Sequence, residues 1–202
     1  KTVLNSSIFY ELYCQEEEKD NTEFKCCMVV NHDEQVKVYS DIAKKLGITE
    51  KYKDVVSKAS TFLNRHKDPD SVDVVFVDEA HLLFTQGNQG YSGKNQLDDI
   101  VKRAKVVVIV FDENQILRMD QYWEKQMIDR YRNKAIEQRN HITLTKQLRM
   151  QADDETLEWI DAFTKKQIIN KIPHHDYEIK IFDSPEVLDL EIQKKANSEK
   201  SR

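Results

Sequence analysis

The sequence predicts a three-layer α/β fold, in which a mostly parallel sheet is covered by helices on both faces. Residues 72–77 and 106–111 are β-branched apolar runs, a pattern typical of central parallel strands that are buried on both sides. Amphipathic helical segments alternate with such runs along the chain, as in a parallel sheet. The 202 residues suffice for one domain of this kind with a sizeable core.

The first third of the chain predicts a helix, a strand and two further helices. Apolar residues recur at helical spacing over 3–13, so we expect a helix that begins at the first residue or earlier. Residues 26–30 form a short apolar run that predicts a buried strand. Residues 36–46 predict an amphipathic helix closed by Gly47. The spacing of apolar residues over 49–63 predicts another helix.

The later segments continue the alternation. Residues 86–93 hold three of the four glycines and form a loop between the two strong strands, and a helix is predicted over 97–104. Farther along, the apolar pattern predicts a strand at 142–148 and a helix at 156–163. An alternating strand at 177–182 and a helix from Ser184 complete the expected order.

Composition excludes several classes of protein. There is no apolar run of about 20 residues and no secretion signal, so we expect no membrane partner. The three cysteines are odd in number and two are adjacent, which suits neither a disulfide framework nor a zinc site. These features predict a cytoplasmic protein. The net charge of −5 argues against a strong electrostatic grip on nucleic acid, although a local basic groove remains compatible with it.

Two carboxylates, Asp78 and Glu79, directly follow the strand predicted at 72–77. In open α/β sheets, ligands bind beyond the carboxyl ends of the strands. At that position one carboxylate can ligate a hydrated Mg²⁺ while the other activates or orients water. The alternative is that the pair simply caps and charges the start of a helix, which stabilises the helix modestly.

Lys1 and Thr2 stand directly before the first predicted helix. In phosphate-binding loops of the pattern G-x-x-x-x-G-K-[ST], backbone amides cradle phosphates, the lysine reaches the β- and γ-phosphates and the hydroxyl ligates Mg²⁺. Such a loop precedes both its helix and the strand that carries the metal carboxylate, which is the order found here. The glycines of the pattern are absent from the sequence, so we expect residues 1–202 alone to bind ATP weakly or not at all.

Two further residues have the chemistry of a nucleotide site. Gln115 follows the strand predicted at 106–111 and can contact a γ-phosphate or the attacking water. Arg149 follows the strand predicted at 142–148 and can stabilise transition-state charge as an arginine finger. The alternatives are an ordinary polar loop residue for Gln115 and a surface ion pair for Arg149.

Together these segments resemble motifs I to IV of superfamily 1 helicases and related P-loop ATPases. The segments are Lys1-Thr2, residues 78–81 (Asp-Glu-Ala-His), residues 112–115 (Asp-Glu-Asn-Gln) and residues 147–149 (Gln-Leu-Arg). More closely, residues 78–87, 93–97, 110–115 and 181–186 resemble the bacterial ATPase family called domain of unknown function 2075, which is Schlafen-like in its helicase core. The resemblance covers most of the chain and implies a RecA-like P-loop NTPase sheet.

The resemblance also implies roles and a domain division. Lys1 would contact phosphate, Thr2 and Asp78 would ligate Mg²⁺, and Glu79 would activate water. Gln115 would sense the γ-phosphate, and Arg149 would stabilise the transition state. Residues 1–172 would form the NTPase domain, truncated at its phosphate loop. Residues 173–202 would form a connector and the start of a second RecA-like domain.

The predicted function is that of a helicase-like ATPase core. ATP and Mg²⁺ are the expected cofactors, and the expected partners are DNA or RNA and the remaining domains of a parent protein. The alternative is a conformational switch that recruits a protein partner in a nucleotide-dependent way without helicase activity. The negative net charge and the incomplete second domain motivate this alternative.

Overall fold

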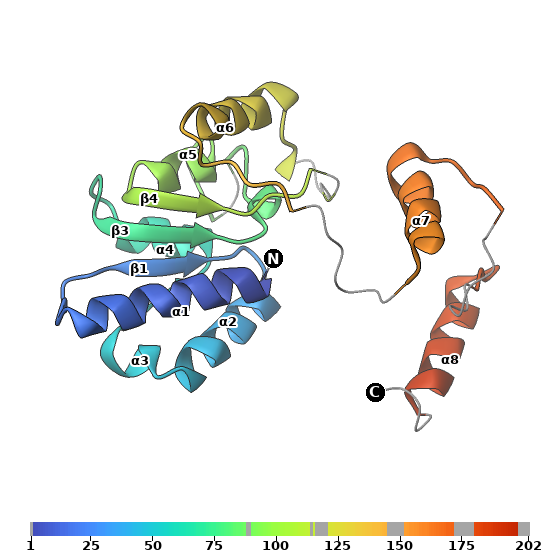
Figure 1. Ribbon diagram of the computed structural model, residues 1–202, viewed down its shortest axis with the longest axis horizontal. Helices are drawn as coiled ribbons and strands as arrows, with labels where there is room; N and C mark the ends of the chain where they lie inside the picture. Colours follow the sequence, from blue (N-terminus) through green and yellow to red (C-terminus); the bar gives the residue numbers. More distant parts are fainter. Residues whose placement is uncertain are drawn as a thin grey trace. The chain divides into compact units, whose positions relative to one another are not determined.

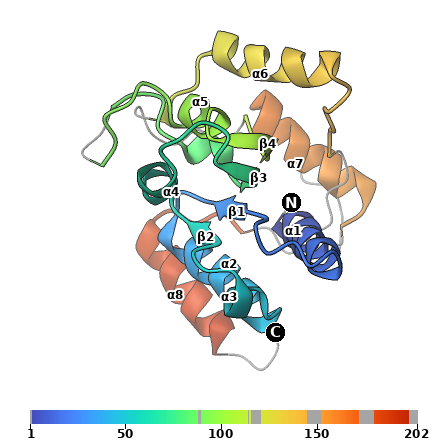
Figure 2. The ribbon, with the colours of Figure 1, turned by 90° about the vertical axis from the view of Figure 1, so that its left-hand side faces the viewer.

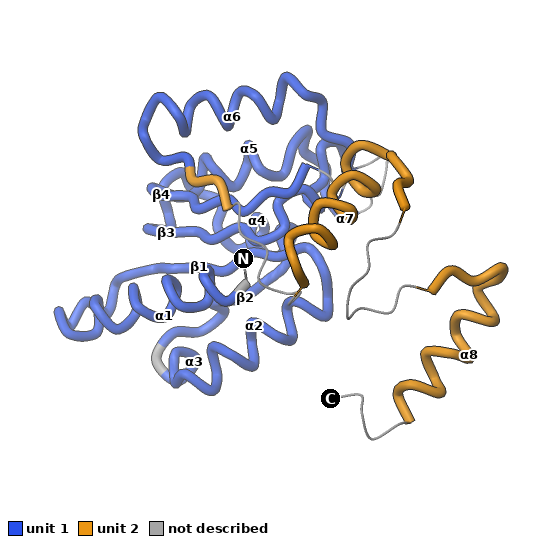
Figure 3. The backbone as a smooth tube through the Cα atoms, turned by 45° about the vertical axis from the view of Figure 1, so that its right-hand side comes forward, with its two compact units in different colours: residues 1–141 blue, residues 142–202 orange. Residues whose placement is uncertain are grey.

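The computed structural model describes residues 2–87, 90–113, 115, 121–144, 152–171 and 180–197, and only the backbone for Thr2 and Lys51. It forms two compact units, residues 1–141 and 142–202, which are coloured separately in Figure 3. Each unit is described by itself below. The division predicted after residue 172 stays a prediction.

The first unit is built on a sheet of four parallel strands in the order β2-β1-β3-β4. The strands are β1 (Cys26–Val29), β2 (Val56–Ser57), β3 (Val72–Val77) and β4 (Ala104–Ile109). Pairing is continuous between the two longest strands, from Val72 opposite Ala104 to Val77 opposite Ile109. The strands at 26–30 and 72–77 are confirmed, and the strand predicted at 106–111 begins two residues earlier.

Helices cover both faces of this sheet, because successive strand residues point to opposite sides. On β1 and β3, Cys27, Val29, Val75 and Val77 belong to one apolar cluster, while alternate residues such as Met28 belong to another. Figure 2 shows α4 and α5 on one side of the sheet and α1, α2 and α3 on the other. The predicted α/β class with helices on both faces is therefore confirmed, and it is consistent with a RecA-like core. The helices of this unit are α1 (Thr2–Glu18), α2 (Asp33–Lys45), α3 (Ile48–Lys51), α4 (Ala59–Arg65), the 3₁₀ turn η1 (Ala80–Leu82), α5 (Gln96–Val101) and α6 (Lys125–Glu137).

The prediction of one long helix over 49–63 is wrong. The structure has instead the short helix α3, the two-residue strand β2 and then α4. Asp54 has a left-handed backbone with φ 59°, which ends any helix that runs through it. Gly47, in contrast, closes α2 with φ 74° as predicted, because glycine adopts this conformation without steric cost.

The second unit contains two described helices, α7 (Asp154–Lys166) and α8 (Pro185–Ala196). They confirm the helices predicted at 156–163 and from Ser184. The strands predicted at 142–148 and 177–182 do not form where the structure describes them, at 142–144 and 180–182, and their other residues lie outside the described part. None of the helices in the described ranges combines the length and apolar character needed to span a membrane.

Candidate functional site

The carboxyl edge of the sheet brings the acidic pair and the start of α1 to the same end of the domain. Asp78 and Glu79 follow β3 directly, and the backbone N–H of Asp78 still donates to the carbonyl of Val29, at the end of β1 (3.0 Å). In Figure 1 the start of α1 lies beside the tip of β1, at the edge toward which the strand arrows point. The N-terminus of a helix favours anions because its first backbone N–H groups are unpaired.

Asp78 is a buried carboxylate with defined partners. The residue is 1% exposed. Its Oδ2 accepts a hydrogen bond of 2.5 Å from the hydroxyl of Tyr39, and its Oδ1 accepts one of 3.1 Å from the backbone N–H of Glu79. Carboxylate oxygens held in this way by further hydrogen bonds suit a hard cation such as Mg²⁺, so the donor chemistry at this position fits the predicted metal.

Glu79 occupies a strained turn. Its backbone is left-handed, with φ 49° and ψ 48°, and its carbonyl accepts from the N–H of Leu82 (2.8 Å). Non-glycine residues adopt this conformation at a cost, and such strain clusters at functional sites. Glu79 is the residue directly before η1, and its side chain makes no capping hydrogen bond to that turn.

A row of aromatic side chains connects this turn to the segment after β4. The Nδ1 of His81 lies 3.5 Å from the Oε2 of Glu79, and the imidazole meets the ring of Phe111 edge to face. Phe111 meets the buried Trp123 in the same way, with ring centroids 5.2 Å apart. The turn that carries the acidic pair is therefore packed against the chain that leads away from β4.

Polar side chains missed at the level of sequence fix the same turn. The carbonyl of Leu82 accepts from the amide of Asn31 (2.5 Å) and from the amide of Gln121 (2.8 Å). The fully buried Gln96 accepts from the backbone N–H of Phe84 (2.9 Å). These partners lie far apart in sequence, so local patterns carry no signal for the contacts. The sequence signal that could have indicated them is the pair of amide side chains at residues 95–96, at the start of a helix.

The other predicted site residues are placed less fully. Gln115 is exposed, and its amide donates to the Oδ2 of Asp112 (2.8 Å). Thr2 is the first residue of α1, and its side chain is not described. Lys1 and Arg149 lie outside the described residues. Asp78 and Glu79 are neighbours in the sequence, and the roles of all six residues stay predictions.

The side chain of Tyr91 connects the glycine-bearing loop of residues 86–93 to α5. The hydroxyl of Tyr91 donates to the Oδ2 of Asp99 on α5 (2.6 Å). Burial, together with this hydrogen bond, raises the pKa of the Tyr91 phenol, which therefore stays protonated at neutral pH. The ring is half-buried against the core, so this face of it is used for packing.

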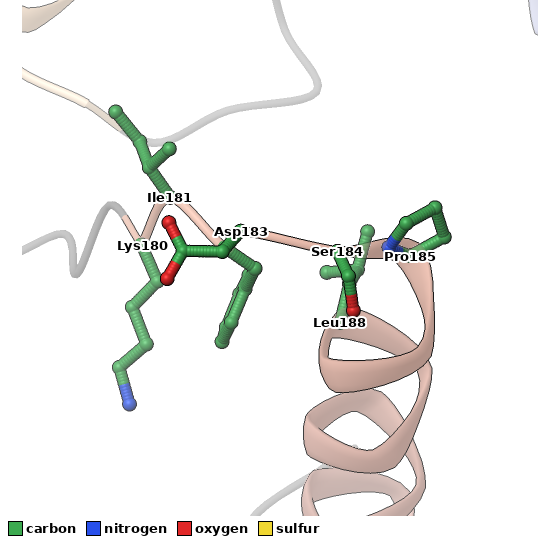
Figure 4. Close-up of a pocket in the computed structure, with 7 residues that line it drawn as sticks. Lys180, Ile181, Asp183, Ser184, Pro185 and Leu188 are labelled. Carbon is green, nitrogen blue, oxygen red and sulfur yellow. The ribbon is translucent and has the colours of Figure 1, made fainter.

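A hollow lies at the start of α8 in the second unit (Figure 4). None of the predicted site residues that the structure describes lines it, and Ser184, which precedes α8, already accepts a capping hydrogen bond from the backbone N–H of Val187. Within the described ranges, no group of three or more His, Cys, Asp or Glu residues is placed to hold a metal ion. The residues that line the hollow are Lys180, Ile181, Phe182, Asp183, Ser184, Pro185 and Leu188.

Comparison with known proteins identifies the family of this chain. A model of the Schlafen group 3 DNA/RNA helicase domain matches residues 1–202. The uncharacterized protein YPL245W of Saccharomyces cerevisiae is 34% identical over 154 residues, which cover 72% of this chain and 33% of the yeast protein. The chain thus spans about a third of the length of that relative. The predicted relation to Schlafen-type helicase cores is confirmed at the level of the family: the chain belongs to the Schlafen group 3 DNA/RNA helicase domain family.

Proposed function

We propose that the full-length protein binds ATP with Mg²⁺ and hydrolyses it at a site to which this chain contributes Asp78 and Glu79, and that hydrolysis drives work on DNA or RNA. The observation that supports this most is the pair Asp78 and Glu79 at the end of a buried central strand. One acid is buried and held by hydrogen bonds, and the other lies in a strained turn beside it. Family membership supports a helicase-like NTPase role in general.

The two acids have different environments and therefore different roles in this proposal. Asp78, fixed by two hydrogen bonds, would hold Mg²⁺ together with the hydroxyl of Thr2. Mg²⁺, when bound, neutralises the charge that develops on the phosphates. Glu79, 14% exposed at its side chain, would orient the attacking water and accept its proton. Lys1 would contact the phosphates from the start of α1.

Two further residues complete the proposed chemistry. Gln115 would sense the γ-phosphate, and since its amide now donates to Asp112, that role requires the side chain to exchange this partner for the nucleotide. Arg149 would supply a permanent positive charge to the transition state. The closer resemblance to the bacterial family called domain of unknown function 2075, and a cytoplasmic location, belong to the same proposal.

The proposal is tested by Glu79→Gln in the full-length protein. The amide keeps the size of the side chain but cannot accept a proton, so we expect MgATP binding to persist and hydrolysis to fall by at least about 100-fold. Glu34→Gln is the matched control, because Glu34 is exposed in the first turn of α2. Unchanged hydrolysis in Glu79→Gln would contradict the assignment.

A second measurement separates the helicase from the switch. If the full-length protein works on nucleic acid, DNA or RNA will stimulate its ATPase rate, and the protein will separate strands or translocate. A nucleotide-dependent switch would show binding and a conformational change without either effect. Assays with single-stranded DNA and RNA of equal length also identify which polymer is the partner.

A further inference from the structure

We propose that Tyr39 is a positioning residue for the metal-binding carboxylate, holding Asp78 in the orientation that receives Mg²⁺. This inference rests on the proposed function. Tyr39 lies on α2 and is 3% exposed, and its hydroxyl donates to the Oδ2 of Asp78 across 39 positions of sequence. The bond is itself buried, so water does not compete with it for either partner.

Packing alone explains the ring of Tyr39 but not its hydroxyl. The ring belongs to the apolar cluster between α1, α2 and the sheet, together with Ala43, Met28 and Phe76. A phenylalanine would fill the same space. A buried hydroxyl is costly unless it is paired, and this one is paired with an acid at the candidate site.

With the Tyr39 hydroxyl, each of the two carboxylate oxygens of Asp78 accepts a hydrogen bond. The backbone N–H of Glu79 donates to Oδ1 while Tyr39 donates to Oδ2, so each oxygen has a fixed donor. A carboxylate has about four lone-pair sites, and these two bonds use two of them. Partners of this kind orient metal ligands, and their loss typically costs 10–100-fold in metal affinity.

The bond also ties the metal ligand to a helix outside the acidic turn. α2 begins at Asp33, four residues beyond the end of β1, and runs along the face of the sheet that carries Phe76. A shift of α2 along its axis would therefore act on the orientation of Asp78 through the Tyr39 hydroxyl. Tyr39 acts on the reaction through Asp78 and needs no contact with the nucleotide.

The test is Tyr39→Phe in the full-length protein, with Tyr13→Phe as the matched control. Tyr13 is equally buried in the same cluster, and its hydroxyl donates to the backbone carbonyl of Cys26, away from Asp78. Affinity for a fluorescent ATP analogue is measured with Mg²⁺ and with EDTA. Electron paramagnetic resonance of the Mn²⁺–nucleotide complex reports on the metal directly, and thermal unfolding without metal reports on stability.

We expect Tyr39→Phe to weaken metal-dependent nucleotide binding by about 10-fold and to leave binding in EDTA unchanged. Tyr13→Phe should change neither affinity, although both variants lose a buried hydrogen bond and some thermal stability. Equal affinities in Tyr39→Phe and wild type, or equal losses in both variants, would overturn the positioning role alone. If the wild type itself binds no metal–nucleotide complex, the proposed function fails, and this inference fails with it.

Discussion

The Nδ1 of the buried His81 lies 3.5 Å from the Oε2 of Glu79. His81 also packs edge to face on Phe111, so its ring lies between the Glu79 side chain and the segment after β4. We expect His81→Ala in the full-length protein to lower kcat for ATP about five-fold, as for the loss of a contact of about 1 kcal/mol. The KM should change less, because the contact acts on Glu79 and not on nucleotide binding.

The control for His81→Ala is Leu83→Ala. Leu83 is buried in the neighbouring apolar cluster, so its truncation also leaves a cavity and lowers the free energy of unfolding by about 2–3 kcal/mol. It has no contact with Glu79 among the described interactions. Steady-state kinetics should show a kcat loss for His81→Ala alone. A similar kcat loss in both variants would mean that only stability matters at position 81.

Gln96 ties the chain after the acidic turn to its neighbours. Its Oε1 accepts from the N–H of Phe84, and its Nε2 donates to the hydroxyl of Ser60 on α4 (3.2 Å). Gln96→Met keeps the volume but leaves the Phe84 N–H without its acceptor. We expect the free energy of unfolding to fall by about 2 kcal/mol, measured by urea denaturation. The exposed Gln15→Met should change it by less than about 0.5 kcal/mol.

Asp73 supplies a pH-dependent contact at the amino end of the sheet, on the strand that carries the acidic pair at its other end. Burial alone would raise its pKa, but hydrogen bonds from the Lys105 ammonium and the Lys25 backbone N–H outweigh burial and hold the pKa below the ordinary 3.8. A carboxyl whose pKa is lower in the folded state stabilises the fold above its unfolded pKa. That contribution disappears as the pH falls through the folded pKa.

Asp73→Asn should therefore lower the free energy of unfolding by up to about 1 kcal/mol at pH 7. The difference from wild type should shrink below about pH 4, as Asp73 becomes protonated. Urea denaturation of the wild type and of Asp73→Asn at several pH values measures this difference. A difference from wild type that is independent of pH would count against the contact.

The cysteines should differ sharply in reactivity. Cys26 and Cys27 are buried on β1, and burial raises the pKa of both thiols, that of Cys27 to about 12. Cys14 on α1 is partly exposed. Since the thiolate is the reactive form, iodoacetamide at pH 8 should modify Cys14 in the folded protein and the other two only after unfolding in urea. Peptide mass spectrometry distinguishes the sites, and fast labelling of Cys27 in the folded protein would contradict its burial.

The central strands could be predicted because their signal is local. A strand buried on both faces is apolar along its whole length, so residues 26–30 and 72–77 can be recognised as strands from their sequence. β2 could not be found this way, since its two residues pair with Met28 and Val29 through contacts distant in sequence. Apolar residues around Tyr52 and Val55 recur at helical spacing although no continuous helix forms there. The helix ends because Asp54 has a left-handed backbone, and the sequence carries no strong signal for that conformation.

The residues of the candidate site could likewise be predicted only where their sequence signal is local. Asp78 and Glu79 could be placed at the carboxyl edge because the pair directly follows a recognisable strand, β3, although their roles stay predictions. Tyr39 could not be connected to them, because the contact depends on how α2 packs on the sheet. A tyrosine on the apolar side of an amphipathic helix was the available signal, since its buried hydroxyl requires a partner.

The left-handed backbone of Glu79 lowers the stability of the fold at a residue with a proposed catalytic role. A non-glycine residue in this conformation costs about 1 kcal/mol, which glycine avoids because it has no Cβ. Glu79→Gly would therefore relieve the strain and at the same time delete the acid. If Glu79 has the proposed role, the loss of hydrolysis in this variant should therefore come with a gain in the free energy of unfolding.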